Sequence, residues 1–153
     1  MEIRKFNDSD FDVFTLMVGV CFVEDYKIAL ANIPLIGLCE DMVQKAKAGI
    51  IFIDILHLDN TPIGFIEYQV DSPESDWYEK EGCGCIREMY IQKEHRGRGY
   101  GKFLAVHAGD ELRKLGVPYI YLTADDAIDF WLSAGYTDTG EICDKNGGKI
   151  LIK

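Results

Sequence analysis

The sequence predicts an α/β (α+β) fold: a single domain with a mixed central sheet of about seven strands flanked by about four helices. The expected elements follow one another as β-α-α-β-β-β-α-β-α-β-β, an order that combines antiparallel hairpins with a crossover unit. The 153 residues are 48% hydrophobic and 27% charged, as in an ordinary globular domain. No internal repeat or low-complexity linker divides the chain, so we expect one domain over residues 1–153.

The expected elements of the N-terminal half are a strand at 2–6, a helix to about Cys21, a helical region at 28–48, and strands at 50–58 and 63–70. Asn7, Asp8 and Ser9 are residue types that cap the start of the first helix. Pro34 interrupts the second helical region and Gly49 ends it, because proline lacks an N–H donor and glycine tolerates a left-handed conformation. The two strands are rich in β-branched residues and enclose a short polar turn, which predicts a hairpin.

The expected elements of the C-terminal half are a strand at 85–91, a helix ending at Leu115, a strand at 117–123, a short helix to about Ala134, and strands at 136–143 and 148–152. The long helix carries apolar residues such as Leu104 and Leu112 at helical spacing. Residues 71–82 are rich in Pro, Ser, Asp and Gly and are expected to form a loop. Asp125 and Asp126 favour the start of the short helix, because acidic side chains complement the positive end of a helix dipole.

The charge balance restricts the partners that the chain can bind. Sixteen Lys and Arg against 26 Asp and Glu leave a formal net charge of −10. Nucleic acids and anionic membranes attract basic surfaces, so neither is expected, whereas a cationic small molecule or basic peptide is favoured. No segment approaches the roughly 20 apolar residues of a membrane span, and the N-terminus lacks an apolar signal core, so we expect a cytoplasmic protein. A monomer and a homodimer both remain open.

The cysteines do not indicate a disulfide framework or a metal centre. There are five, an odd number, and Cys83 and Cys85 are separated by one residue. Without a secretory signal they are expected to be reduced thiols. No second Cys-x-x-Cys or nearby histidine cluster completes a four-ligand zinc site, so we expect no metal; a redox or metal role for the close pair is the less favoured alternative.

Residues 93–102, Lys-Glu-His-Arg-Gly-Arg-Gly-Tyr-Gly-Lys, lie between an expected strand and an expected helix. Four basic residues against one acidic residue concentrate positive charge in a chain whose net charge is −10. Three glycines at alternate positions let successive backbone N–H groups turn toward an anion at the helix N-terminus. These features predict a polyphosphate-binding turn. The alternative is a solvated surface turn.

Two nucleotide-binding motifs fail at this turn. A dinucleotide fingerprint that starts at Gly97 requires glycine where the chain has Lys102. A Walker A loop requires glycine at the position of Arg96 and Ser or Thr at the position of Phe103. A nucleotide-binding regulatory domain is therefore disfavoured.

The turn resembles the glycine-rich loop of the GNAT superfamily of N-acetyltransferases. The family pattern Arg-x-x-Gly-x-Gly is met at 96–101, directly after the hydrophobic strand and polar spacer that begin at Met89. Farther along, the family has an aromatic pair and a Gly-aromatic dipeptide, which match Phe-Trp at 130–131 and Gly-Tyr at 135–136. The order of elements agrees along essentially the whole chain, although the N-terminal half matches in pattern only.

The resemblance implies a single GNAT-like domain that is an acetyl-CoA-dependent N-acetyltransferase. The family reaction is direct attack of an amine on the thioester, so the implied acceptor is the primary amine of a small molecule or peptide, and the acidic composition favours a cationic one. Backbone N–H groups of the turn would hold the pyrophosphate, and the pantetheine arm would pair with the preceding strand. The implied cofactor-binding residues are Met89, Tyr90, Ile91, Arg96, Gly97, Arg98, Gly99, Tyr100, Gly101 and Lys102. The alternative is a non-catalytic acyl-CoA-binding sensor module of the same fold.

The family reaction needs a base, because a protonated amine is not a nucleophile. Glu88 lies in the strand that would hold the thioester and is the candidate base, and an exposed or ion-paired Glu88 is an equally weighted alternative. Strand alternation predicts that Glu88 shares one face with Ile86 and Tyr90, while Arg87 points to the other. Glu67, in the neighbouring strand, is a weaker candidate.

Trp131 occupies the position of the tyrosine that usually protonates the leaving thiolate in the family. An indole N–H cannot act as a general acid at ordinary pH, so either the thiolate leaves unprotonated or another tyrosine substitutes. His57, His95 and His107 have no visible partner in the sequence and are not favoured as bases.

The walls of the acceptor site carry the weakest signal. Trp77 and Tyr78, in the acidic loop 71–82, are placed to receive a cationic amine by charge and cation–π contact. A solvated loop with one aromatic anchor is the favoured alternative. The helical region 28–48 is expected to form the other wall.

Overall fold

The computed structural model describes all residues 1–153 and confirms the predicted fold class. The strands are β1 (Glu2–Lys5), β2 (Phe52–Leu58), β3 (Thr61–Val70), β4 (Gly84–Ile91), β5 (Ile120–Ala124), β6 (Thr137–Ile142) and β7 (Lys149–Ile152). The α-helices are α1 (Phe11–Glu24), α2 (Leu35–Lys47), α3 (Tyr100–Lys114) and α4 (Ile128–Ser133). The strands form one sheet in the order β1-β2-β3-β4-β5-β7-β6, in which only the neighbours β4 and β5 run parallel.

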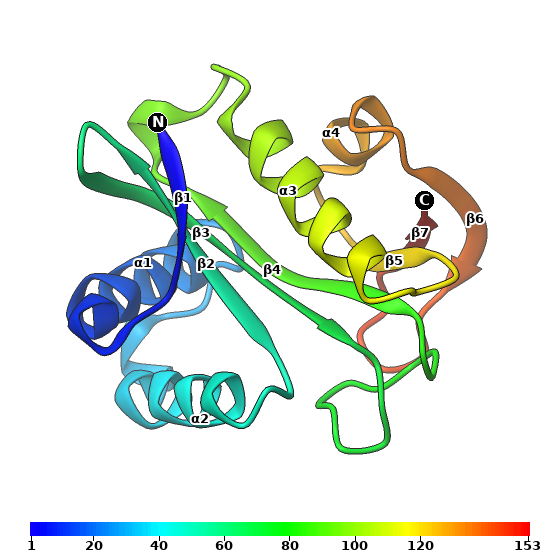
Figure 1. Cartoon of the computed structure of the whole chain (residues 1–153), viewed down its shortest axis with the longest axis horizontal. Helices are drawn as coiled ribbons and strands as arrows, with labels where there is room; N and C mark the ends of the chain where they lie inside the picture. The colour runs from blue at the N-terminus through cyan, green and yellow to red at the C-terminus, as the bar shows by residue number, and fades with distance from the viewer.

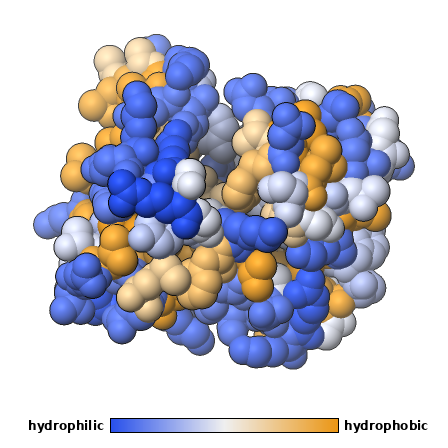
Figure 2. Space-filling view, turned by 90° about the horizontal axis from the view of Figure 1, so that it is seen from above, coloured by the Kyte–Doolittle hydropathy of each residue, from blue (hydrophilic) through white to orange (hydrophobic).

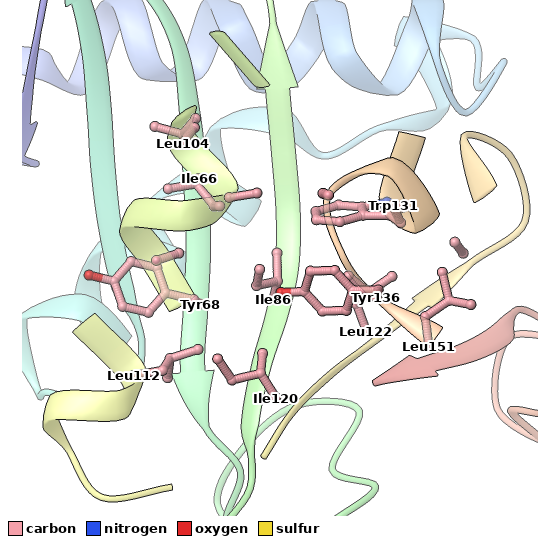
Figure 3. Close-up of a cluster of buried hydrophobic side chains, with 14 of the residues drawn as sticks. Ile66, Tyr68, Ile86, Leu104, Leu112, Ile120, Leu122, Trp131, Tyr136 and Leu151 are labelled. Carbon is pink, nitrogen blue, oxygen red and sulfur yellow. The ribbon is translucent and has the colours of Figure 1, made fainter. Parts of the chain in front are cut away.

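Two helices cover each face of the sheet (Figure 1). α1 and α2 lie on one face and bury a core that includes Phe14, Ile55 and Phe65. α3 and α4 lie on the opposite face, where a second core includes Ile66 and Leu104 (Figure 3). None of the helices combines the length and the apolar composition that a membrane-crossing helix needs.

The N-terminal helices differ in their bounds from the prediction. Asn7 does cap the first turn, because its side chain accepts a hydrogen bond from the Ser9 N–H at 3.0 Å, and α1 then continues beyond Cys21 to Glu24. The predicted helical region 28–48 is wrong in its first part, since only a short 3₁₀ turn forms there before α2 begins. Pro34 directly precedes α2 instead of interrupting it, because a residue without an N–H is tolerated at a helix start.

β5 is shorter than the predicted strand at 117–123 and begins at Ile120. Gly116 has a φ of 80°, which ends α3 in a left-handed conformation. Pro118 follows and has no N–H to donate to a strand partner, so regular pairing starts two residues later.

The alternation predicted for β4 is also wrong. Glu67 of β3 pairs with Glu88, but the next residue, Tyr68, pairs with Ile86, so Arg87 is an extra residue at a β-bulge. A bulge shifts the side-chain alternation by one position. Ile86 therefore joins the core under α3, whereas Tyr90 joins the core under α1 and α2.

A buried carboxylate fastens α3, the helix that follows the glycine-rich turn, to the sheet. Asp54 on β2 accepts a hydrogen bond from the Tyr68 hydroxyl at 2.8 Å. The same carboxylate lies 2.7 Å from the Nε2 atom of His107 on α3. The side chain of Asp54 is only 3% exposed. His107, for which the sequence shows no partner, therefore has Asp54 as its partner in the structure.

We expect Asp54→Ala to lower the free energy of unfolding by about 3 kcal/mol, because the buried Tyr68 hydroxyl and the partly buried His107 ring lose their partner. Urea unfolding measures this change. The matched control is Asp110→Ala, which removes an exposed ion pair to Arg113 and is expected to cost less than about 1 kcal/mol. Equal losses in the two variants would contradict the structural role of Asp54.

Candidate active site

The sheet opens between its two parallel strands. β4 and β5 pair only at Gly84 with Ile120 and at Cys85 with Tyr121, and they diverge beyond these residues. Farther along, the N–H of Gln92 donates to β3 at 2.9 Å. Because peptide groups alternate along a strand, the N–H groups of Met89 and Ile91 face the opening instead. β4 therefore presents free backbone donors to a ligand that enters the opening.

The glycine-rich turn between β4 and α3 lies at one end of this opening, in the green loop at the top of Figure 1. The backbone N–H groups of all residues from Gly97 to Lys102 make no hydrogen bond within the protein. Gly97 and Gly99 have φ values of 74° and 85°, which favour glycine, and open space lies where their Cβ atoms would be. Six consecutive unpaired donors at the N-terminus of a 15-residue helix are an arrangement that typically binds an anion.

Gly101, the third glycine of the turn, is needed for helix packing. A Cβ atom on Gly101 would lie 3.2 Å from the ring of Phe130 on α4. Glycine at this position therefore lets α3 and α4 approach each other. Seen from the end of the molecule that carries the turn, the surface is mostly hydrophilic and shows a hollow between two lobes (Figure 2).

The basic side chains of the turn differ in the contacts that they make. The Arg96 guanidinium makes two hydrogen bonds to the Asp25 carboxylate, each 3.0 Å long, and its Nε atom donates to the Ile91 carbonyl at 2.7 Å. Lys102 donates to the Ser133 carbonyl at 3.1 Å, and Arg98 has no ion pair. Arg96 thus fastens the end of α1 to the turn, and Arg98 is left with a free charge.

A cavity of about 140 Å³ lies on the α1 and α2 side of β3 and β4. Its walls combine apolar side chains with charged ones from four parts of the chain. The lining residues are Val18, Phe22, Leu38, Asp41, Met42, Lys45, Ile51, Phe65, Glu67, Gln69, Asp76, Trp77, Arg87 and Glu88. The cavity therefore brings together Glu67 and Glu88, the two candidate bases from the sequence, and α2, which was expected to form one wall of the acceptor site.

Glu67 and Glu88 are direct neighbours across β3 and β4. Burial and the charge of Glu88 raise the pKa of Glu67 to about 8. Burial also raises the pKa of Glu88, but a hydrogen bond from Tyr26 and the charge of Arg87 oppose that rise. At neutral pH Glu67 is therefore mostly protonated, while the hydrogen bond from Tyr26 and the charge of Arg87 favour the ionised form of Glu88.

Tyr26 is a site residue that the sequence reasoning did not find. It lies just after α1, and its hydroxyl donates to Glu88 Oε2 at 2.5 Å. Nothing in its local pattern signals this contact, because 62 residues separate the partners. The hydrogen bond holds the Glu88 side chain in the cavity and stabilises its charged form.

The acidic loop 71–82 closes one side of the cavity. The buried Asp71 carboxylate accepts hydrogen bonds from the N–H groups of Glu79 and Lys80, both at 3.0 Å, and from the Tyr121 hydroxyl. At the other end of the loop, Lys45 of α2 forms an ion pair with Asp76. Trp77 lines the cavity and remains 55% exposed, so the loop reaches the site and is not simply solvated.

Trp131 is part of the core of α4. Its ring packs edge-on against Phe130 at 5.0 Å and Tyr136 at 5.3 Å between centroids, and it is 8% exposed (Figure 3). These contacts account for a large aromatic residue at this position. They assign no proton-transfer role to the indole.

The resemblance to N-acetyltransferases implies that a thiol is released, and we expect Trp131→Phe to keep the rate of this release within about threefold, because an indole N–H is not an acid at ordinary pH. The smaller ring is expected to lower the free energy of unfolding by about 1–2 kcal/mol. Steady-state thiol release and urea unfolding measure the two effects. A 100-fold slower reaction at unchanged stability would instead give Trp131 a chemical role.

The other nominated groups lie elsewhere. His57 is buried with its Nδ1 atom 3.2 Å from the Ile55 carbonyl, and His95 packs near Tyr100 beside the turn. All five cysteines are buried and unpaired. No group of three or more His, Cys, Asp or Glu side chains is arranged to hold a metal ion.

Comparisons with known proteins agree with this geometry. The PaiA N-acetyltransferase from Thermoplasma acidophilum, in complex with coenzyme A, has a TM-score of 0.75 and 17% identity over 99% of this chain and 97% of that one. A predicted acetyltransferase with acetyl-CoA from Clostridium acetobutylicum has a TM-score of 0.74 and 20% identity over 92% of each chain. An aminoglycoside 6'-N-acetyltransferase from Acinetobacter haemolyticus has a TM-score of 0.72 and 15% identity over 93% and 94%. No curated protein matches the sequence.

These solved structures share the fold of this chain. The model of the acetyltransferase (GNAT) family matches residues 21–136, more than half of the chain. The chain belongs to this family, and the resemblance inferred from the turn is confirmed.

Proposed function

We propose that the protein is an acetyl-CoA-dependent N-acetyltransferase, active as a single domain over residues 1–153. It transfers the acetyl group to the primary amine of a small molecule or peptide by direct attack on the thioester. The observation that carries this proposal is the run of six unpaired backbone N–H groups from Gly97 to Lys102 at the start of α3. This run fits a pyrophosphate, because it offers many donors, no Cβ atoms at two glycines and a helix dipole of the right sign.

The acetyl-CoA residues follow from that fit. The N–H groups of the turn would hold the pyrophosphate, with Arg98 as a free positive charge nearby. The free peptide groups of Met89 and Ile91 would pair with the amides of the pantetheine arm, as in strand addition. Bound in this way, acetyl-CoA supplies an activated acyl group as a thioester.

The chain's own residues would then move protons and orient the acceptor. Glu88, whose charged form is favoured by the hydrogen bond from Tyr26, accepts a proton from the incoming ammonium group, since only the neutral amine is a nucleophile. A free N–H on β4 stabilises the negative charge that develops on the carbonyl oxygen. A thiol with a pKa of about 8.5 is a good leaving group, so we propose that no dedicated acid replaces the missing tyrosine.

The acidic cavity supports an acceptor that arrives as a cation. Four carboxyl groups, from Asp41, Glu67, Asp76 and Glu88, line it against two basic side chains. The alternative function, a non-catalytic acyl-CoA sensor, is favoured only by Trp131 at the position of the usual acid.

Calorimetry with acetyl-CoA, combined with thiol release in the presence of amines, tests the proposal. The panel contains polyamines, amino acids, aminoglycosides and peptides. Binding together with turnover of one amine class is the expected result. Tight binding without turnover of any amine would favour the sensor, and no binding would overturn both functions.

A further inference from the structure

Two consecutive residues of opposite charge line the same cavity. Neighbours along a regular strand point to opposite faces, so Arg87 and Glu88 would ordinarily be separated by the sheet. The bulge in β4 makes Arg87 an extra residue, and both side chains line the cavity beneath α1 and α2. The cavity therefore contains a cation and an anion from consecutive residues.

Arg87 is the cavity's cation without a carboxylate partner. Lys45 is already bound to Asp41 at 2.6 Å and to Asp76, whereas Arg87 appears in none of the ion pairs of the protein. Glu88 lies outside ion-pair distance of Arg87, although the charge of Arg87 lowers the pKa of Glu88, and its Oε2 atom accepts a hydrogen bond from the Tyr26 hydroxyl. A partly buried guanidinium with free donors is a typical binding group for a carboxylate, which it contacts through two parallel hydrogen bonds.

Half of the residues that line the cavity are apolar. Phe22, Leu38, Met42 and Phe65 come from both helices and β3, and Trp77 adds an exposed ring at the edge. The volume of about 140 Å³ is close to that of a cavity of about 150 Å³ known to hold benzene. One branched aliphatic or aromatic side chain fits such a space.

We propose that the acceptor is a free α-amino acid with an apolar side chain, an inference that rests on the proposed acetyltransferase function. Its ammonium group lies at the Glu67–Glu88 pair, its carboxylate binds Arg87, and its side chain contacts the apolar wall. A peptide N-terminus carries an amide where Arg87 requires a carboxylate. A simple amine leaves Arg87 without a partner.

The transfer to this acceptor balances as follows. The amine nitrogen forms a C–N bond to the acetyl carbonyl carbon while the C–S bond breaks and the sulfur takes the electron pair. Of the two protons that the ammonium group loses, one passes to Glu88 and then to water, and the other ends on the departing thiolate. The products are the N-acetyl amino acid, coenzyme A as thiol, and one proton.

The test compares three acceptors that share one side chain: L-leucine, L-leucinamide and 3-methylbutylamine. With saturating acetyl-CoA, we expect kcat/KM from thiol release to be at least tenfold higher for leucine than for the other two. Arg87→Glu is expected to reverse this order, because it places a carboxylate where leucine carries one, whereas Arg87→Lys keeps the order with weaker discrimination. The control Arg113→Glu makes the same charge change at an exposed ion pair on α3 and leaves the ratio unchanged.

Calorimetry of leucine with the protein loaded with coenzyme A gives a second readout that does not need turnover. If leucine binds and Arg87→Glu abolishes that binding, the amino acid site is supported even where no acetylation occurs. The absence of acetylation would then contradict only the transferase function. An equal or higher kcat/KM for the amine or the amide, or no leucine binding, overturns the amino acid proposal. Turnover of other amines would then leave the N-acetyltransferase function standing.

Discussion

Gly99→Glu is expected to weaken acetyl-CoA binding at least 100-fold while the fold stays intact. Gly99 has a φ of 85°, and no atom lies within 4 Å of the place where a Cβ would be. The new side chain therefore causes no clash, but its carboxylate points into an anion-binding turn. Two like charges about 4 Å apart near a protein surface repel by roughly 4 kcal/mol, which exceeds the roughly 2.7 kcal/mol of a 100-fold change. Calorimetry measures the affinity.

Gly147→Glu is the matched control for that variant. Gly147 has a φ of 74° and the same open surroundings, but it lies in the turn between β6 and β7. Both substitutions carry the strain of a left-handed residue, about 1–2 kcal/mol, so both are expected to lower the melting temperature alike. Only Gly99→Glu should lose the cofactor. An unchanged affinity in Gly99→Glu would remove the turn from the pyrophosphate site.

Glu88→Gln is expected to lower kcat/KM about 100-fold at pH 7, the lower end of the effect of removing a general base. Burial raises the pKa of Glu88, so in the wild-type protein activity falls as the pH drops through that raised value and the carboxylate is protonated. At high pH the amine loses its proton in solution and needs the base less. The loss in Glu88→Gln should therefore shrink as the pH rises, which a pH–rate profile measures.

Glu67→Gln separates the two carboxyl groups. Because the pKa of Glu67 is raised to about 8, this side chain is mostly neutral at pH 7, and glutamine resembles the neutral acid in shape. We expect Glu67→Gln to keep kcat/KM within about threefold of the wild-type value at pH 7. Equal losses in Glu67→Gln and Glu88→Gln, or an unchanged pH–rate profile in Glu88→Gln, would remove Glu88 from the role of base.

The glycine-rich turn between a strand and a helix could be predicted because its signals are local. Alternate glycines, clustered basic residues and a position between strand and helix all lie within residues 93–102. The contacts that each residue of the turn makes could not be predicted in this way. Arg96 binds Asp25, which is 71 residues away, and Gly101 makes room for Phe130 of α4. Such contacts depend on how α1 and α4 pack, which no local pattern encodes.

The candidate acceptor site was predicted only in part. The position in the strands indicated Glu88 and Glu67 as candidate bases, and the composition of the loop indicated Trp77 as a candidate contact of the amine. The prediction placed Arg87 on the opposite face because it assumed unbroken alternation, which the bulge between β3 and β4 interrupts. Tyr26 and Lys45 gave no chemical signal, since each acquires its partner across the fold.

The sequence by itself determined the order of the elements, the mixed sheet, the glycine-rich turn and the family, because hydrophobic period, glycine spacing and local charge are properties of short segments. The tertiary structure alone decided which charges share the cavity. Strand register and bulges arise from pairing between distant segments, and burial then sets which carboxyl keeps its proton. The raised pKa of Glu67, the hydrogen bond on Glu88 and the position of Arg87 in the cavity arise only when β3, β4 and the two N-terminal helices are assembled.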